Sequence, residues 1–153
     1  MQFETSPNYL LRGVLAVVGA FIIFLGLNIG LGGIQTLGWQ GGAVDFLTVR
    51  NAPVFVVRDS HVRFIGGVWL ALGLLMLAGS FAFQRLRSVL VALTFMIFVG
   101  GIARLSGGDL PLLLSADIAP SFLFEIIIVP LLGWWFTKAE GLRPIQFSGP
   151  DLS

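Results

Sequence analysis

The side chains best able to do chemistry stand at the ends of long uncharged stretches. Asp59, His61 and Arg63 come directly before one such stretch. Arg104 ends another stretch, and Glu125 interrupts a third. Arginine forks bind carboxylates and phosphates, while glutamate and histidine can exchange protons. These five residues therefore define the candidate site, either as an ion-pair cluster or as a site for an anion.

Glycines accompany both arginines. Each arginine has two glycines three and four residues away, and this spacing places them on the same helical face. The expected result is a slot lined by small residues beneath two guanidinium groups. A separate pair in the first apolar stretch has the GxxxG spacing that allows close helix packing, which we expect within the chain rather than at a homodimer contact. The six glycines are Gly26, Gly30, Gly66, Gly67, Gly100 and Gly101.

Glu125 is the partner that we expect both arginines to share. It lies seven residues after Ile118, where its apolar stretch begins, and that spacing corresponds to about 10 Å along a helix. An unpaired carboxylate at such a depth in lipid is costly, so it should face inward and find a cation. Arg63 and Arg104 are expected at the same outer end. Ser121, one turn before Glu125, is expected to line the slot.

Three interpretations of this cluster stay open. The first is a structural ion pair that fixes the register of the helices. The second is a binding site for an anionic amphiphile or lipid headgroup, because two arginines exceed one glutamate by one positive charge. The third is a proton relay through Glu125 and His61. Ser80 and Thr94 alone continue polar character inward from the second and third stretches, which argues against a transmembrane proton path.

Composition excludes several function classes. The chain has no cysteine and a single histidine, which excludes disulfides, thiolate nucleophiles, iron–sulfur clusters and bis-histidine haem ligation. His61 and Asp59 together offer two ligands, too few for a zinc site. A net charge of +1 provides no basic patch for nucleic acid. No catalytic residue, cofactor or metal is expected, and an enzyme is the least favoured class.

The elements that position these residues should be helices in lipid. Only 11% of the residues are charged and 56% are hydrophobic, whereas a soluble domain carries about 25% charged residues. The mean hydropathy is +0.94. We therefore predict one all-α membrane domain, a polytopic protein whose four transmembrane helices form an antiparallel bundle. The helices are expected at about residues 13–34, 62–83, 88–104 and 118–137.

The rest of the chain should lie outside the bundle. Residues 35–60 predict an outer loop that rests on the membrane, where Asn51 can cap a short helical turn with Pro53 near its start. Pro130 should kink the last helix. Residues 141–153 predict a polar tail.

The distribution of basic residues predicts the orientation. With four crossings, both termini and the middle connection share one side, which carries five basic and three acidic residues, while the other side carries four of each. The positive-inside rule then places both termini in the cytoplasm. We expect a bacterial inner membrane. The five basic residues are Arg12, Arg85, Arg87, Lys138 and Arg143.

The charged ends and the glycines belong to a longer pattern. It reads Arg63-xx-Gly66-Gly67, then Leu70-Ala71-Leu72-Gly73, then Gly100-Gly101-xx-Arg104-x-Ser106, Pro111 and Glu125. This pattern resembles an uncharacterised family of bacterial four-helix membrane proteins, a domain of unknown function that is distantly similar to DoxX-like proteins. The resemblance covers roughly residues 10–137. It implies a four-helix bundle with shared polar positions at Arg63, Arg104 and Glu125, and no established activity.

The expected function follows from these limits. Some DoxX-like relatives are small subunits of membrane oxidoreductases. The sequence therefore favours a non-enzymatic accessory or structural subunit, embedded in the bilayer and packed against a larger respiratory, photosynthetic or oxidoreductase complex. The alternative is a binding protein or transporter for an anionic amphiphile or a lipid headgroup at the two arginines and Glu125.

Overall fold

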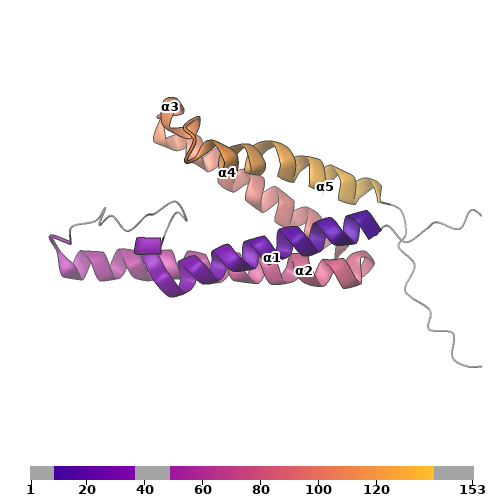
Figure 1. Ribbon diagram of the computed structural model, residues 1–153, viewed down its shortest axis with the longest axis horizontal. Coiled ribbons are helices and arrows are strands. Elements are labelled where there is room, and N and C mark those ends of the chain that lie inside the picture. The colour runs from indigo at the N-terminus through magenta and orange to yellow at the C-terminus, as the bar shows by residue number, and fades with distance from the viewer. Residues whose placement is uncertain (1–8, 37–48, 140–153) are drawn as a thin grey trace, which may run out of the picture.

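The fold is all-α, as the sequence predicts. The computed structural model describes residues 9–36 and 49–139, and these contain helices, turns and no strand (Figure 1). The long elements are α1 (Tyr9–Gly32), α2 (Ala52–Ala103) and α5 (Val129–Lys138). The short ones are η1 (Gly33–Thr36), η2 (Arg104–Gly107), α3 (Leu110–Leu113), α4 (Ala119–Leu123) and the π-helical turn η3 (Phe124–Ile128).

Three helical segments in the described part of the chain are long and apolar enough to cross a membrane, rather than the four that we predicted. They are Tyr9–Thr36, Ala52–Gly107 and Ala119–Lys138. The difference arises because the second and third predicted helices are one element, α2. The chain turns back inside it at Ala82, whose φ of −125° and ψ of 42° are not helical. The expected connection at residues 84–88 is itself helical, so the bend precedes it.

The first boundary of α2 also corrects the prediction of an outer loop at 35–60. The helix already begins at Ala52, because the Asn51 side chain accepts a hydrogen bond from the Val54 amide and Pro53 occupies the first turn. This cap was expected, but the helix that it starts continues without interruption into the apolar stretch. Polar residues therefore extend the helix beyond its apolar part. The predicted tail at 141–153 lies outside the described residues.

Glycines bring α1 and the first half of α2 into backbone contact. A Cβ added at Gly19 would lie 2.7 Å from the Leu77 nitrogen, and one at Gly73 would lie 2.6 Å from the Ile23 nitrogen. Gly26 and Gly66 are just as crowded by the facing backbone, and Gly66 faces Gly30. The GxxxG pair Gly26 and Gly30 thus serves packing within the chain.

The second half of α2 packs against α5 and η3, so the molecule consists of two helical layers (Figure 1). The layers join near the bend, where Leu11, Leu90 and Phe136 are completely buried. Phe83 and Phe136 meet there edge to face, with ring centroids 5.8 Å apart. Away from the bend, the layers diverge toward the end that carries α3.

The last predicted helix, 118–137, is built from three successive pieces. Pro120 stands in the first turn of α4, as expected. Pro130 lacks the amide hydrogen that an α-helix would direct to the Ile126 carbonyl, and the turn before it widens into η3. In that turn the Val129 amide bonds to the Phe124 carbonyl, five residues back. The predicted disturbance at Pro130 is therefore a π-helical turn.

Adjacent glycines provide a direct test of this packing. Gly66→Ala should lower the free energy of unfolding by about 1–3 kcal/mol, because its Cβ would overlap the Gly30 backbone. Gly67→Ala, where a Cβ meets nothing within 4 Å, should be neutral or stabilising by up to about 1 kcal/mol. Both can be measured by denaturation in mild detergent. Equal effects of the two variants would contradict the helix contact.

Candidate functional site

The centre of the candidate site is an ion pair between Arg104 and Glu125. The guanidinium Nε lies 2.7 Å from Glu125 Oε2, and one terminal nitrogen lies 2.8 Å from Oε1. This is a two-pronged contact, the geometry in which an arginine fork matches a carboxylate best. The Glu125 side chain is 7% exposed and that of Arg104 is 39% exposed. The arginine therefore reaches from the surface to a buried acid.

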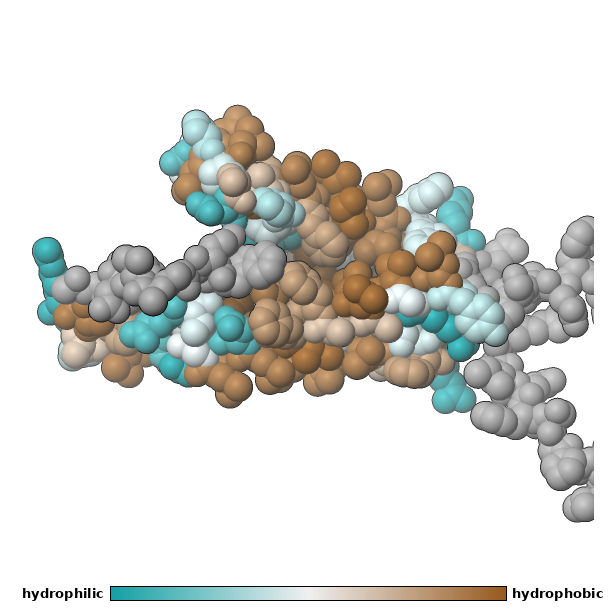
Figure 2. All heavy atoms as spheres, viewed as in Figure 1, coloured by the Kyte–Doolittle hydropathy of each residue, from teal (hydrophilic) through white to brown (hydrophobic). Residues whose placement is uncertain are grey.

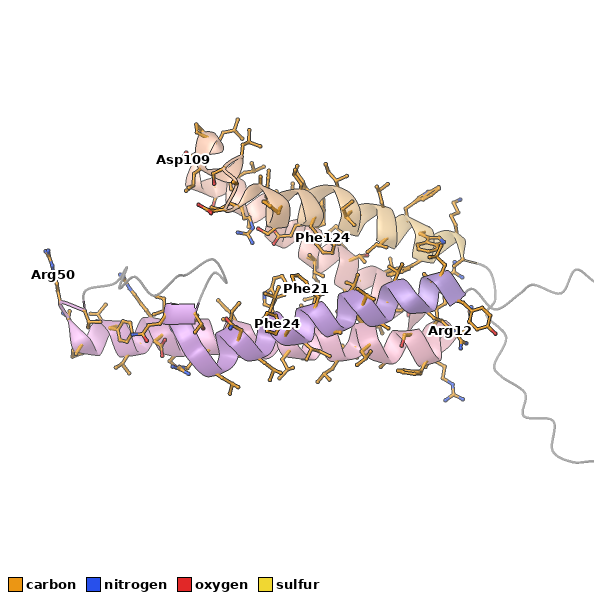
Figure 3. All side chains as sticks on the ribbon, in the orientation of Figure 1. Arg12, Phe21, Phe24, Arg50, Asp109 and Phe124 are labelled. Atoms are coloured by element: carbon orange, nitrogen blue, oxygen red, sulfur yellow. The ribbon has the colours of Figure 1, made fainter. Side chains whose placement is uncertain are left out.

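Two local features let Glu125 enter the helix packing. Gly101, one turn before Arg104, leaves the space, because a Cβ there would stand 2.8 Å from the Glu125 Cβ. Glu125 itself lies in η3, next to the labelled Phe124 (Figure 3). The widened turn changes the direction in which the carboxylate leaves the helix. The sequence predicts a kink at Pro130. It does not predict that the distorted turn contains Glu125.

Arg63 does not join this pair, which corrects the prediction of a shared partner. Its Nε lies 2.6 Å from Asp59 Oδ2, one turn earlier on the same helix. Its terminal nitrogens donate to the last carbonyls of α1, those of Gly30, Leu31 and Gly32. The cation thus satisfies carbonyls that the helix leaves without partners and complements the negative end of the helix dipole.

Asp59 completes this arrangement at the end of α1. Its second oxygen, Oδ1, accepts a hydrogen bond of 2.8 Å from the Ile34 amide. The chain reaches that position through Gly33, which has a φ of +72°. A side chain at Gly33 would also overlap the Asp59 carboxylate. Arg63 and Asp59 together therefore anchor the end of α1 to the beginning of α2.

The remaining predicted residues are not part of either contact. His61 is exposed on α2. Ser121 is exposed and donates to the Ile118 carbonyl of its own helix, so it does not line the slot. Gly67 and Gly100 are exposed, with nothing within 4 Å of an added Cβ. Successive residues on a helix point about 100° apart, so only one glycine of each pair can face the neighbouring helix.

Arg87 is a structural residue that sequence reasoning missed. Its Nε donates to the Phe136 carbonyl at 2.8 Å, and a terminal nitrogen donates to the Thr137 carbonyl. It thus secures the end of α5 as Arg63 secures the end of α1. An arginine near a helical bend, beside an unpaired helix C-terminus, is the signal that could have found it. From the sequence, Arg87 is expected only as one of the basic residues on the cytoplasmic side.

The site has the chemistry of a charge-neutral contact. Glu125 balances Arg104, and Asp59 balances Arg63. The described residues contain no group of three or more histidine, cysteine, aspartate or glutamate side chains that could hold a metal ion. What the two contacts show directly is ion pairing by Arg104 and Arg63 and capping of the end of α1.

In the part of the chain that the structure describes, fold and site together define membrane-length helices joined by arginine contacts. Residues 10–136 match the family model "Domain of unknown function (DUF4345)", and the chain belongs to that family. Neither the search of curated proteins nor that of solved structures finds a match.

Removing one partner of the pair should be more damaging than removing both. Arg104→Met should lower the free energy of unfolding by about 3–5 kcal/mol, because it leaves a buried carboxylate without its cation. Combining it with Glu125→Leu should restore most of that loss. Denaturation in detergent measures both, and the exposed Ser121→Ala serves as the neutral control. A double variant as unstable as Arg104→Met would refute the proposed cost of the lone charge.

Proposed function

We propose that the protein is a non-enzymatic integral membrane protein that acts as an accessory or structural subunit of a larger membrane complex. The resemblance to DoxX-like proteins suggested by the sequence pattern, which the comparisons do not test, is our reason for naming a respiratory, photosynthetic or oxidoreductase complex as the partner. In this proposal the chain crosses a bacterial inner membrane four times, with both termini in the cytoplasm. The bilayer covers the apolar surface that no partner covers.

One observation carries this proposal: the polar groups that could do chemistry are used to hold helices together. Arg104 is matched by Glu125, and Arg63 is held by Asp59 and the end of α1. The outer surface is instead rich in large apolar side chains, such as Phe64 at 71% and Phe81 at 78% exposure. Figure 2 shows this apolar surface over both layers of the molecule.

The alternative of an anion-binding site at the same residues has less support. That interpretation relied on two arginines facing one glutamate, with one positive charge left over. Arg63 and Arg104 have separate carboxylate partners, so each contact is neutral. An anion would have to displace the Glu125 carboxylate from Arg104 and leave it buried without a cation, which is costly.

Cysteine labelling tests the four crossings. A helix of 52 residues would be about 78 Å long if straight, far longer than the roughly 30 Å of bilayer hydrocarbon, so the bend at Ala82 should make two crossings. The chain has no cysteine of its own. In intact cells, an impermeant maleimide should label Ser60→Cys and Ser106→Cys. Gln84→Cys should react only after lysis. Labelling of all three from one side would contradict four crossings.

Site-specific photocrosslinking tests the accessory role. A photoreactive amino acid at the exposed Phe64 or Phe95 should give a reproducible crosslink to one membrane protein in the native host. The same residue at Met76, which is 1% exposed, is the matched control on the same helix and should give none. The crosslinked protein should also co-purify in mild detergent. Crosslinks to lipid alone, together with migration as a lone monomer, would refute the accessory role.

A further inference from the structure

The two ends of the molecule differ in charge. At one end α1 begins, α2 bends and α5 finishes, and we call this the basic end. Arg12 marks it in Figure 3, opposite Arg50 and Asp109. Within the described residues the basic end carries four cations and no acid, whereas the other end carries all four acids. The cations are Arg12, Arg85, Arg87 and Lys138, and the acids are Asp59, Asp109, Asp117 and Glu125.

The cations of the basic end are not neutralised by the helices around them. The ion pairs Arg63–Asp59 and Arg104–Glu125 both lie at the other end of the described structure. Arg87 is occupied by carbonyls of α5. The Arg12 Nε is buried and has no hydrogen-bond partner in the described part of the chain.

An apolar groove starts at the same end. It has a volume of about 400 Å³ and runs along the first turns of α1. The groove is shallow and open, and its lining residues all belong to α1, from Tyr9 and Leu10 beside the basic end to Val17 and Val18 two turns further along the helix. Gly13 lies in its floor, and a Cβ added there would meet nothing within 4 Å. Tyrosine is common where a membrane protein meets the headgroup layer.

We propose that the basic end binds an anionic phospholipid of the leaflet that it faces. Arg12, Arg85 and Lys138 attract the phosphate and the headgroup, and the groove along α1 takes an acyl chain. The cations of the basic end favour an anion, and the groove along α1, which has almost no polar lining, favours an apolar chain. An amphiphilic ligand satisfies both. The inference rests on the proposed membrane location, but it requires no protein partner.

An anionic lipid fits better than a free anion. Each basic residue near a charged membrane surface contributes about 1 kcal/mol of attraction to anionic lipid. Inorganic phosphate could meet the cations, but it would leave the apolar groove unused. The acids Glu4, Glu140 and Asp151 lie outside the described residues. Arg12 and Lys138 belong to the terminal turns of α1 and α5, and Arg85 and Arg87 follow the bend of α2 at Ala82.

Native mass spectrometry of the full chain tests the proposal. The purified protein is titrated with phosphatidylglycerol or phosphatidylcholine of identical acyl chains, and bound lipids are counted. We expect a clear preference for phosphatidylglycerol. Arg85→Gln combined with Lys138→Gln should lower that preference at least about tenfold, whereas Arg50→Gln combined with Arg58→Gln should leave it unchanged. Gly13→Leu should weaken binding of both lipids, because it fills the groove.

Three results would overturn the proposal. The first is equal binding of the two lipids by the unaltered protein. The second is an equal loss of preference in both pairs of charge variants, which would indicate an unspecific effect of net charge. The third is displacement of phosphatidylglycerol by millimolar inorganic phosphate alone. Thermal melting checks that each variant is folded. Arg12→Lys keeps the positive charge and should keep the preference for phosphatidylglycerol.

Cysteine labelling tests the membrane location independently. Failure of the lipid proposal can therefore be told apart from failure of the proposed membrane location.

Discussion

The pairing of Glu125 with Arg104 is the contact on which the second layer of the molecule depends. A carboxylate buried among apolar helices is costly unless a cation pairs with it, and Arg104, directly after the end of α2, reaches both oxygens of Glu125. The ion pair therefore sets the position of η3 along the axis of α2. It also explains why Gly101 faces the acid, since any side chain there would push the carboxylate away from the guanidinium.

Arginines within α2 organise the rest of the fold by binding the ends of neighbouring helices. Arg63 and Arg87 each bind the carbonyls that end a neighbouring helix, α1 in one case and α5 in the other. These carbonyls have no partner within their own helices, and the arginine side chains provide donors for them. Two of the arginines of the chain thus close helix ends. Because few charged side chains lie along the helices, their outer surface is apolar and can contact lipid or a protein partner.

The two proposals concern different parts of that surface. The accessory role depends on the exposed aromatic residues along α2, while lipid binding depends on the cations and the groove near the start of α1. Both are consistent with a structure that has membrane-length helices and neutral internal ion pairs. A headgroup bound at the basic end would also offset positive charge where α1, α2 and α5 converge, so lipid could stabilise the meeting point of the layers.

Much of this organisation could be predicted from the sequence. Low charge and long apolar stretches were sufficient for the all-helical fold, and the cap at Asn51 followed from residue type and spacing. The pairing of Arg104 with Glu125 followed from depth, because a buried acid needs a cation at the same height. The match of residues 10–136 to the domain of unknown function DUF4345 confirms the resemblance to an uncharacterised family over nearly the expected range.

Only the tertiary structure decided which groups meet. Spacing along a helix sets the depth of a side chain, but the partner it reaches depends on how neighbouring helices are rotated and how far each extends. Arg63 has the depth to approach Glu125, yet the close backbone contact at Gly26 and Gly66 brings the end of α1 to it instead. The same packing selects Gly66 over Gly67. The bend at Ala82, not the charged segment after it, separates the two halves of α2.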